Sequence, residues 1–268
     1  MDTGFVQSDQ ASLYYERAGA GLPVVFIHAG VADCRQWDRE SPSFARDHEV
    51  LRFDMRGYGR SLPVDGPYSH MSDFTTVLDR LGMDGTLVLV GCSMGGTMAL
   101  DFTLAYPSRV RALVLVGSAP GGLRLAAEDH PMEADAEEAN EAGDLDRAAE
   151  LEAQIWFDGV DRTADQVDAA ARKKMIEMNR LALVHAALGL GTRLPAPEPA
   201  AATRLHEIAV PLLALVGAHD LQYFRSAADV MEKEVRGARK VVFDNAAHLL
   251  NMEHSARFEE EIRSFLAG

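Results

Sequence analysis

Short apolar runs recur along the chain, and each ends at a glycine or a polar residue. Runs of four or five residues that stay apolar are typical of strands buried on both faces of a sheet. Helix-compatible segments separate them, so the pattern predicts an α/β fold with a mostly parallel sheet covered on both sides. The predicted strands are 13–17 (in an N-terminal hairpin), 24–27, 50–53, 86–90, 112–116, 212–216 and 240–243, and the predicted helices are 34–46, 72–81, 97–106, 226–235 and 253–266.

The alternation breaks in the middle of the chain. Between about 121 and 209 no strand pattern is convincing, and alanine-rich helical stretches lie near 133–157 and 165–190. A linker rich in proline and alanine, 194–200, closes this segment. The segment therefore reads as a helical insertion placed before the strand at 212–216.

Length and composition fit this organisation. The chain has 268 residues, of which 47% are hydrophobic and 25% charged, enough for one sizeable core. We expect a core domain formed by 1–120 and 210–268, with 121–209 as a helical cap, or lid. The N-terminus has neither a basic region nor an apolar stretch, and no apolar run approaches the length of a membrane span.

The formal net charge of −15 argues against a nucleic-acid or anionic-membrane partner, because both require a basic patch. Most of the excess negative charge lies between 128 and 152, which contains 11 acidic residues and one basic residue. This run is either a funnel for cationic substrates or the solvated face of a helix. The second interpretation is favoured, since charge runs usually face water.

The sharpest local signal is Gly91-Cys92-Ser93-Met94-Gly95, which fits G-x-S-x-G. It follows an apolar strand and precedes a helical segment, so the turn would expose the Ser93 hydroxyl. The Met94 backbone N–H would then point toward an anion forming at a bound carbonyl. A phosphate-binding loop is disfavoured, because no lysine follows the glycines.

Two later strands end in residues that could serve this serine. Asp220 follows the strand at 212–216, and His248 follows the strand at 240–243. The carboxyl ends of parallel strands share one edge of a sheet, where ligands bind. The order Ser93, Asp220, His248 is that of a nucleophile, an acid and a base in acyl transfer.

With these residues in hand, the chain resembles the α/β-hydrolase fold superfamily over nearly its whole length, in its capped serine-hydrolase branch of esterases, lactonases and haloperoxidases. The resemblance implies an eight-stranded type of sheet and a catalytic triad of Ser93, Asp220 and His248. It also implies an oxyanion hole made by the backbone N–H groups of Gly30 and Met94. Ala29 and Ala247 stand where relatives often have glycine. The matching motifs are His28-Ala29-Gly30-Val31, Trp37, 54–61, 91–96, 217–220 and His248.

Other residues compete for these roles. His219 adjoins Asp220, which is poor geometry for bonding to it, so His248 is preferred as the base. His28 resembles the family's structural histidine. The turn at Ser93 is called here the elbow; Asp101 lies within the predicted helix that follows it, too close in sequence to Ser93 to reach a distant histidine. Cys92 is interpreted as a small buried filler rather than a reactive thiol.

The predicted function is hydrolysis of an ester or lactone of small to medium, partly apolar substrates. A serine nucleophile speaks against carboxylate-based dehalogenase and epoxide-hydrolase chemistry. Thioester, amide or carbon–carbon hydrolysis, cofactor-free perhydrolysis and a non-catalytic receptor stay open as alternatives. The candidate substrate-pocket residues are Trp37, Trp156, Phe157, Met175, Met178 and Phe224, each of which plain core packing would explain equally well.

No cofactor and no metal is expected. Two cysteines, Cys34 and Cys92, make neither a disulfide framework nor a metal site, so a cytoplasmic location is the default. The expected partner is a small-molecule substrate, with the chain a monomer or homodimer.

Overall fold

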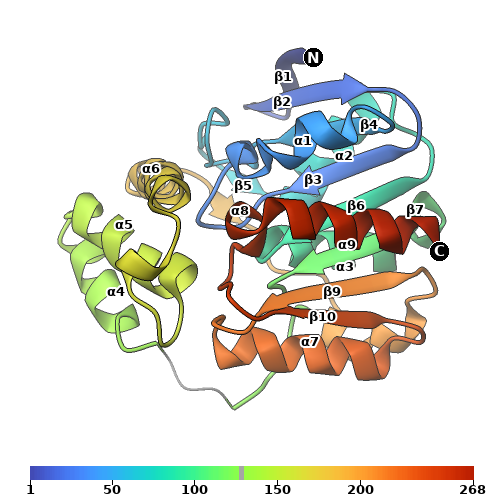
Figure 1. Cartoon of the computed structure of the whole chain (residues 1–268). Coiled ribbons are helices and arrows are strands. Elements are labelled where there is room, and N and C mark those ends of the chain that lie inside the picture. Colours follow the sequence, from blue (N-terminus) through green and yellow to red (C-terminus); the bar gives the residue numbers. More distant parts are fainter. Residues whose placement is uncertain (127–129) are drawn as a thin grey trace.

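The computed structural model describes residues 1–126 and 130–268, and its centre is an eight-stranded sheet (Figure 1). The strand order is β1-β2-β4-β3-β6-β7-β9-β10, with β1 and β2 forming an antiparallel hairpin. β2 also pairs antiparallel with β4, and the remaining neighbours are parallel. The strands are β1 (Asp2–Ser8), β2 (Ala11–Gly19), β3 (Pro23–Ile27), β4 (Glu49–Phe53), β6 (Leu87–Cys92), β7 (Val110–Val116), β9 (Leu212–Gly217) and β10 (Arg239–Phe243).

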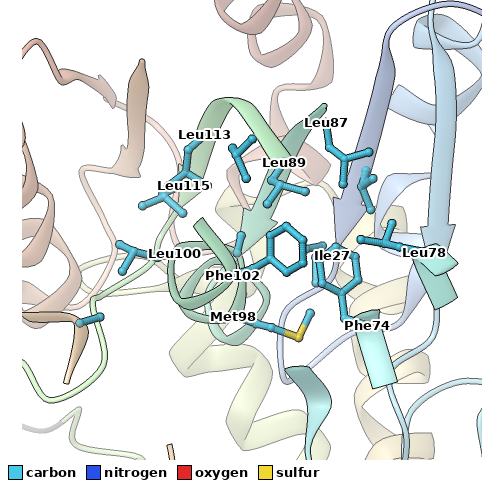
Figure 2. Packing of buried hydrophobic residues seen from close by; sticks show 14 of the residues in the cluster. Ile27, Phe74, Leu78, Leu87, Leu89, Met98, Leu100, Phe102, Leu113 and Leu115 are labelled. Atoms are coloured by element: carbon cyan, nitrogen blue, oxygen red, sulfur yellow. The ribbon is translucent and has the colours of Figure 1, made fainter. Parts of the chain in front are cut away.

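Helices cover both faces of the sheet, as the uninterrupted apolar strands predicted. Side chains alternate along β3, so that Val25 and Ile27 join one apolar cluster and Val24 and Phe26 join the other. α2 (His70–Arg80), α3 (Met94–Ala105) and α7 (Gln222–Glu234) contribute to the first cluster, part of which Figure 2 shows. α1 (Glu40–Phe44) and α9 (Ser255–Ala267) contribute to the second.

The predicted helix at 34–46 is two short pieces instead, η1 (Cys34–Trp37) and α1. Pro42 explains the division. Proline has no N–H to bond the preceding turn, so it is tolerated only in the first turn of a helix that begins anew at Glu40. α2 begins earlier than predicted, because the Ser69 hydroxyl accepts the Ser72 N–H and caps it. The smaller pieces are η2 (Pro107–Arg109) and α8 (Leu250–Glu253).

The segment between β7 and β9 is mainly helical, as predicted. Figure 1 shows its α-helices gathered at one side of the sheet, apart from the two covering layers. The sequence missed a two-residue strand, β8 (Thr192–Arg193), which pairs in parallel with β5 (Pro67–Tyr68), because two exposed residues carry no apolar pattern. The helical pieces are α4 (Glu133–Glu141), α5 (Leu145–Ala153), the π-helical turn η3 (Gln154–Asp158), η4 (Ala164–Gln166), α6 (Ala169–Ala186), η5 (Ala201–Thr203) and η6 (Leu205–Glu207).

Several polar contacts tie this insertion to the core, among them one at Arg162 and one at Leu194. Arg162 forms an ion pair with Glu253 at 2.7 Å, and the two side chains are 8% and 5% exposed. Glu253 also accepts the backbone N–H of Ala247, the residue before His248. At the other end, the Leu194 N–H bonds the Tyr68 carbonyl beside the small β5–β8 sheet.

None of the helices in the described ranges is both long and apolar enough to cross a membrane. The acidic run begins at Glu128 and Asp129, which lie outside the described residues. The acidic residues of this run on α5 have different surroundings. Glu150 pairs with Arg172, whereas Glu152 is half-buried and lines a cavity next to Ser93.

Candidate active site

Ser93 occupies a strained turn between β6 and α3. Its φ of 51° and ψ of −117° fall where a residue with a side chain rarely lies. The turn is held by the Ser93 N–H bonding the Val116 carbonyl at 2.8 Å. Glycine neighbours are required, since a Cβ at Gly95 would lie 2.5 Å from the Ile27 carbonyl oxygen. The sequence therefore forces the Ser93 hydroxyl out of the sheet edge.

His248 and Asp220 form a buried hydrogen-bonded pair at the same edge. Nδ1 of His248 lies 2.9 and 3.0 Å from the two carboxylate oxygens of Asp220, and each residue is 1% exposed. Asp220 also accepts the Leu221 N–H, which fixes the carboxylate. Gly117 makes room for the pair, because a Cβ there would lie 2.9 Å from His248 Nδ1.

Two aromatic rings flank the His248 imidazole. The Trp156 ring lies 4.8 Å away, centroid to centroid, and the Phe224 ring 4.5 Å away. Trp156 comes from the π-helical turn η3, and Phe224 from α7, so one flank belongs to the insertion and the other to the core. Both rings restrict the orientation of the imidazole while its Nδ1 stays on Asp220.

Unused backbone donors lie next to Ser93. Among the described residues, neither the Gly30 N–H nor the Met94 N–H takes part in a hydrogen bond. The two residues are neighbours, since a Cβ on Gly30 would lie 3.8 Å from the Met94 Cβ. Met94 is also the first residue of α3, where a helix leaves its N–H groups free. The pair has the composition of an oxyanion hole.

Ser93 lines two cavities. The first, called here the Arg193 cavity, measures about 390 Å³ and runs between α3 and the linker. Asp101 lies on its wall, and burial raises the pKa of that carboxyl to about 6. Arg193 reaches the Met94 sulfur at 3.5 Å and forms no ion pair with any described carboxylate. The side chains that line this cavity include Ser93, Met94, Thr97, Asp101, Arg193 and Phe224.

The second, called here the Glu152 cavity, measures about 350 Å³ and runs between Ser93 and the insertion. The core contributes Gly30, Ser93 and His248. Much of the remaining wall is apolar and comes from α6. Its principal insertion residues are Glu152, Trp156, Asn179, Ala182, Leu183 and Ala186.

Of the predicted pocket residues, Trp156 and Phe224 line these cavities. The prediction is wrong for Trp37, which is fully buried between Phe26 and Phe258. It is also wrong for three residues of the insertion, which are fully buried in the core cluster and line neither cavity: Phe157, Met175 and Met178. Helical spacing alone could not separate these apolar side chains from Trp156, because they differ only in which face of the turn they occupy.

The competing residues have structural roles. His219 faces the Val160 carbonyl at 3.0 Å rather than Asp220. His28 donates to the Ala29 carbonyl and accepts the Met55 N–H, and burial lowers the pKa of its imidazole. Burial raises the pKa of the Cys92 thiol to about 12, so this thiol stays protonated and unreactive at neutral pH.

One group of side chains has the residue types of a metal site, but its candidate ligand atoms are already bonded to protein or protonated. Candidate ligand atoms of Asp33, Cys34 and Asp54 all lie within 4.8 Å of one another. Asp54 already accepts the N–H groups of Cys34 and Arg60, and Asp33 is bound by Arg35. Burial raises the pKa of the Cys34 thiol far above its usual range, so no thiolate is offered. The group fixes the loop after β4.

A sequence model described as "Alpha/beta hydrolase family" matches residues 24–261. The chain belongs to this family. It is 27% identical over 268 aligned residues to the putative 2-succinyl-6-hydroxy-2,4-cyclohexadiene-1-carboxylate synthase of Bacillus subtilis (strain 168), covering 94% of this chain and 93% of the relative. Identity to a 2-hydroxy-6-oxononadienedioate/2-hydroxy-6-oxononatrienedioate hydrolase of Klebsiella pneumoniae is 26%, over 91% of this chain and 86% of that one.

Among solved structures, a thermophilic esterase from Thermogutta terrifontis superposes with a TM-score of 0.78 at 24% identity. The match covers all of this chain and 98% of the esterase, and at this identity it shows the shared fold. The predicted α/β-hydrolase resemblance and fold class are thus confirmed. Family membership and the relatives support hydrolytic chemistry at a coarse level.

Proposed function

We propose that this α/β-hydrolase family member is a serine hydrolase that cleaves esters or lactones of small to medium, partly apolar substrates through an acyl-enzyme on Ser93. The observation that carries the proposal is the His248–Asp220 pair, buried beside the cavity that Ser93 also lines. The strained backbone of Ser93 adds support, because strain of this kind gathers at functional sites.

Each residue then has one task. The Ser93 hydroxyl attacks the substrate carbonyl while His248 Nε2 takes its proton. His248 passes that proton to the departing alkoxide, and the alcohol leaves. Asp220 holds Nδ1 throughout, which keeps the imidazole in the required tautomer and stabilises its cation. His248 next takes a proton from a water molecule, whose oxygen attacks the acyl carbon. The bond between that carbon and the Ser93 oxygen then breaks, His248 returns the proton to Ser93, and the acid leaves.

The negative oxygen formed in both steps is assigned to the N–H groups of Gly30 and Met94. Both donors are free of partners in the described part of the chain, they lie next to each other, and neither depends on a side chain. Fixed donors of this kind stabilise the tetrahedral intermediate without having to reorganise. The insertion is assigned the role of a cap, since Trp156 brings it against His248 and its helices wall the Glu152 cavity.

A second candidate is hydrolysis of a carbon–carbon bond beside a carbonyl on the same residues. Two observations favour it. The Klebsiella pneumoniae relative carries the name of a dienedioate and trienedioate hydrolase. This chain places Arg193 on a cavity wall without a carboxylate partner among the described residues, which suits an acidic substrate.

The test is a panel of nitrophenyl esters, lactones, thioesters, amides and 2-hydroxy-6-oxodienoates of graded length. Hydrolysis of an ester or lactone should exceed that of the other classes. Ser93→Ala should lower kcat for this hydrolysis by several orders of magnitude and leave the circular dichroism spectrum unchanged. Asp220→Asn should lower kcat about 10⁴-fold.

A fluorophosphonate should label Ser93 in the wild-type chain and leave Ser93→Ala unlabelled. Absence of both labelling and turnover would contradict the proposal and favour a binding protein. Preference for the dienoate would instead establish the second candidate. Nearly full activity in Asp220→Asn would mean that another acid supports His248.

A further inference from the structure

The Glu152 cavity holds a polar pair that the proposed mechanism does not use. Asn179, on α6, is 2% exposed and its Nδ2 donates to Glu152 Oε2 at 2.6 Å. Both side chains line the cavity that also contains Ser93 and His248. A carboxyl group from the insertion is therefore held in place within the chamber of the nucleophile.

This carboxyl group is not neutralised by protein. Among the described residues Glu152 has no ion pair, and neither its Oε1 nor Asn179 Oδ1 has a hydrogen-bond partner. Glu150, two residues before Glu152 on α5, behaves in the opposite way: Arg172 lies 2.7 Å from Glu150 and lowers the pKa of its carboxyl group. Burial instead raises the pKa of Glu152, against the smaller effect of the Asn179 bond.

These two oxygens, Glu152 Oε1 and Asn179 Oδ1, are not sealed off by protein, so a ligand in the cavity can reach them. An acceptor that faces apolar walls finds few donors on the protein, and a ligand donor placed opposite it forms a hydrogen bond that the walls cannot supply. Ala182, Leu183 and Ala186 form such a wall here. Tyr58, the nearby hydroxyl of the cavity, has only a weak contact to the Met94 sulfur at 3.9 Å. A hydrogen-bond donor on a ligand would match these two acceptors.

We propose that Glu152, held by Asn179, accepts a hydrogen bond from a hydroxyl or ammonium group of the substrate, so that the Glu152 cavity selects substrates carrying a donor on the part it encloses. The inference rests on the proposed function in taking Ser93 as the reacting centre. It adds the chemistry of one end of the substrate and assigns Glu152 as a specificity residue. The other end lies in the Arg193 cavity, because Ser93 lines both.

The test compares rigid esters that differ only in the donor. Nitrophenyl esters of trans-4-hydroxy-, trans-4-amino- and trans-4-methylcyclohexanecarboxylic acid have similar size and do not cyclise onto their own carbonyl. The acetates of the matching cyclohexanols place the same groups on the alcohol side. In at least one series, kcat/KM for a donor ester should exceed that for the methyl ester by roughly ten- to a hundred-fold, as expected for a hydrogen bond to a charged group.

Glu152→Ala should bring this ratio close to one. Glu152→Gln keeps an acceptor oxygen without the charge, so it should preserve more of a hydroxyl preference than of an ammonium preference. Glu138→Ala is the matched control: it removes one negative charge from an exposed position of the insertion, on α4, and should leave the ratio as in the wild-type chain.

Binding to Ser93→Ala separates this inference from the proposed function, since binding needs no turnover. Calorimetry with the three cyclohexane acids and the three cyclohexanol acetates should give tighter binding of a donor compound, and Ser93→Ala/Glu152→Ala should lose that difference. If donor and methyl compounds differ in affinity by the same factor in Ser93→Ala and in Ser93→Ala/Glu152→Ala, the role of Glu152 is overturned even if esters are hydrolysed. Donor-selective binding without any turnover would support Glu152 and contradict the hydrolase.

Discussion

Glu40 is a carboxyl group fully enclosed by protein and remote in sequence from its partners. Its oxygens accept from Ser255 Oγ at 2.8 Å and from Asn251 Nδ2 at 3.4 Å. These neutral donors do not replace the lost water, so burial raises the pKa of Glu40 from 4.5 to about 7. A group with a raised pKa stabilises the fold when protonated, and this contribution disappears as the pH rises through that pKa.

We predict that Glu40→Gln removes part of the pH dependence of stability. The Glu40 contribution should be complete below pH 4.5 and lost above about 7, a change on the order of 3 kcal/mol. In guanidinium unfolding at pH 5, 7 and 9, the free energy of unfolding of the variant should therefore rise relative to that of the wild-type chain as the pH increases. A constant difference between the two proteins across this range would contradict the prediction.

Residue type alone did not reveal which tryptophan belongs to the site. Trp37 and Trp156 both lie within segments predicted as helical, yet Trp37 packs on Phe26 and Trp156 packs on His248. Glu152 and Arg193 were missed for the same reason, because one lies in an acidic run and the other directly before the linker. Neither has an ion-pair partner in the part of the chain that the structure describes, and only the fold shows which groups surround them.

At the level of elements, the β6–α3 junction shows how closely sequence and site are linked. The strand ends beside Gly91, the helix begins at Met94, and the crossing leaves no space for a methyl group at Gly95. Such a requirement is visible in the sequence, because only glycine fits there. The elbow, its strand and its helix were accordingly predicted within three residues of their observed bounds.

We predict that Gly95→Ala destabilises the chain by roughly 1–3 kcal/mol or more and abolishes ester hydrolysis, because its Cβ would meet the Ile27 and His28 carbonyl oxygens at 2.5 Å. Gly85→Ala is the control: its Cβ would meet nothing within 4 Å and its φ is not positive, so stability should change by less than about 0.5 kcal/mol. Thermal unfolding and a nitrophenyl ester assay measure both effects. Similar behaviour of the two variants would refute this account of the elbow.

For the whole molecule, the alternation of strands and helices along the chain followed from the hydrophobic pattern, whereas the contacts that attach the segment between β7 and β9 to the core did not. The pattern separated strands from helices because buried parallel strands are apolar throughout. The Arg162–Glu253 pair joins residues 91 positions apart, and nothing in local sequence indicates that they meet. The division into a core of 1–120 and 210–268 and a cap of 121–209 stays a prediction.

We predict that Arg162→Met costs about 3–5 kcal/mol, because it leaves Glu253 buried without a cation. Ester hydrolysis should fall as well, since Glu253 holds the backbone just before His248. The double variant Arg162→Met/Glu253→Gln should recover part of the stability. As a control, a variant that breaks the exposed Lys173–Glu177 pair should lose less than about 0.5 kcal/mol. Chemical unfolding of the four proteins tests this, and equal losses for the buried and exposed pairs would argue against it.

The exposed linker before β9 divides the proposed nucleophile from its helpers. A cut anywhere in 194–199 would give one fragment with Ser93 and another with Asp220 and His248. The two pieces would still meet along the β7–β9 ladder, from Leu113 opposite Leu212 to Val116 opposite Leu215. Separately expressed halves would regain turnover only on joining, which makes this seam suitable for a complementation reporter.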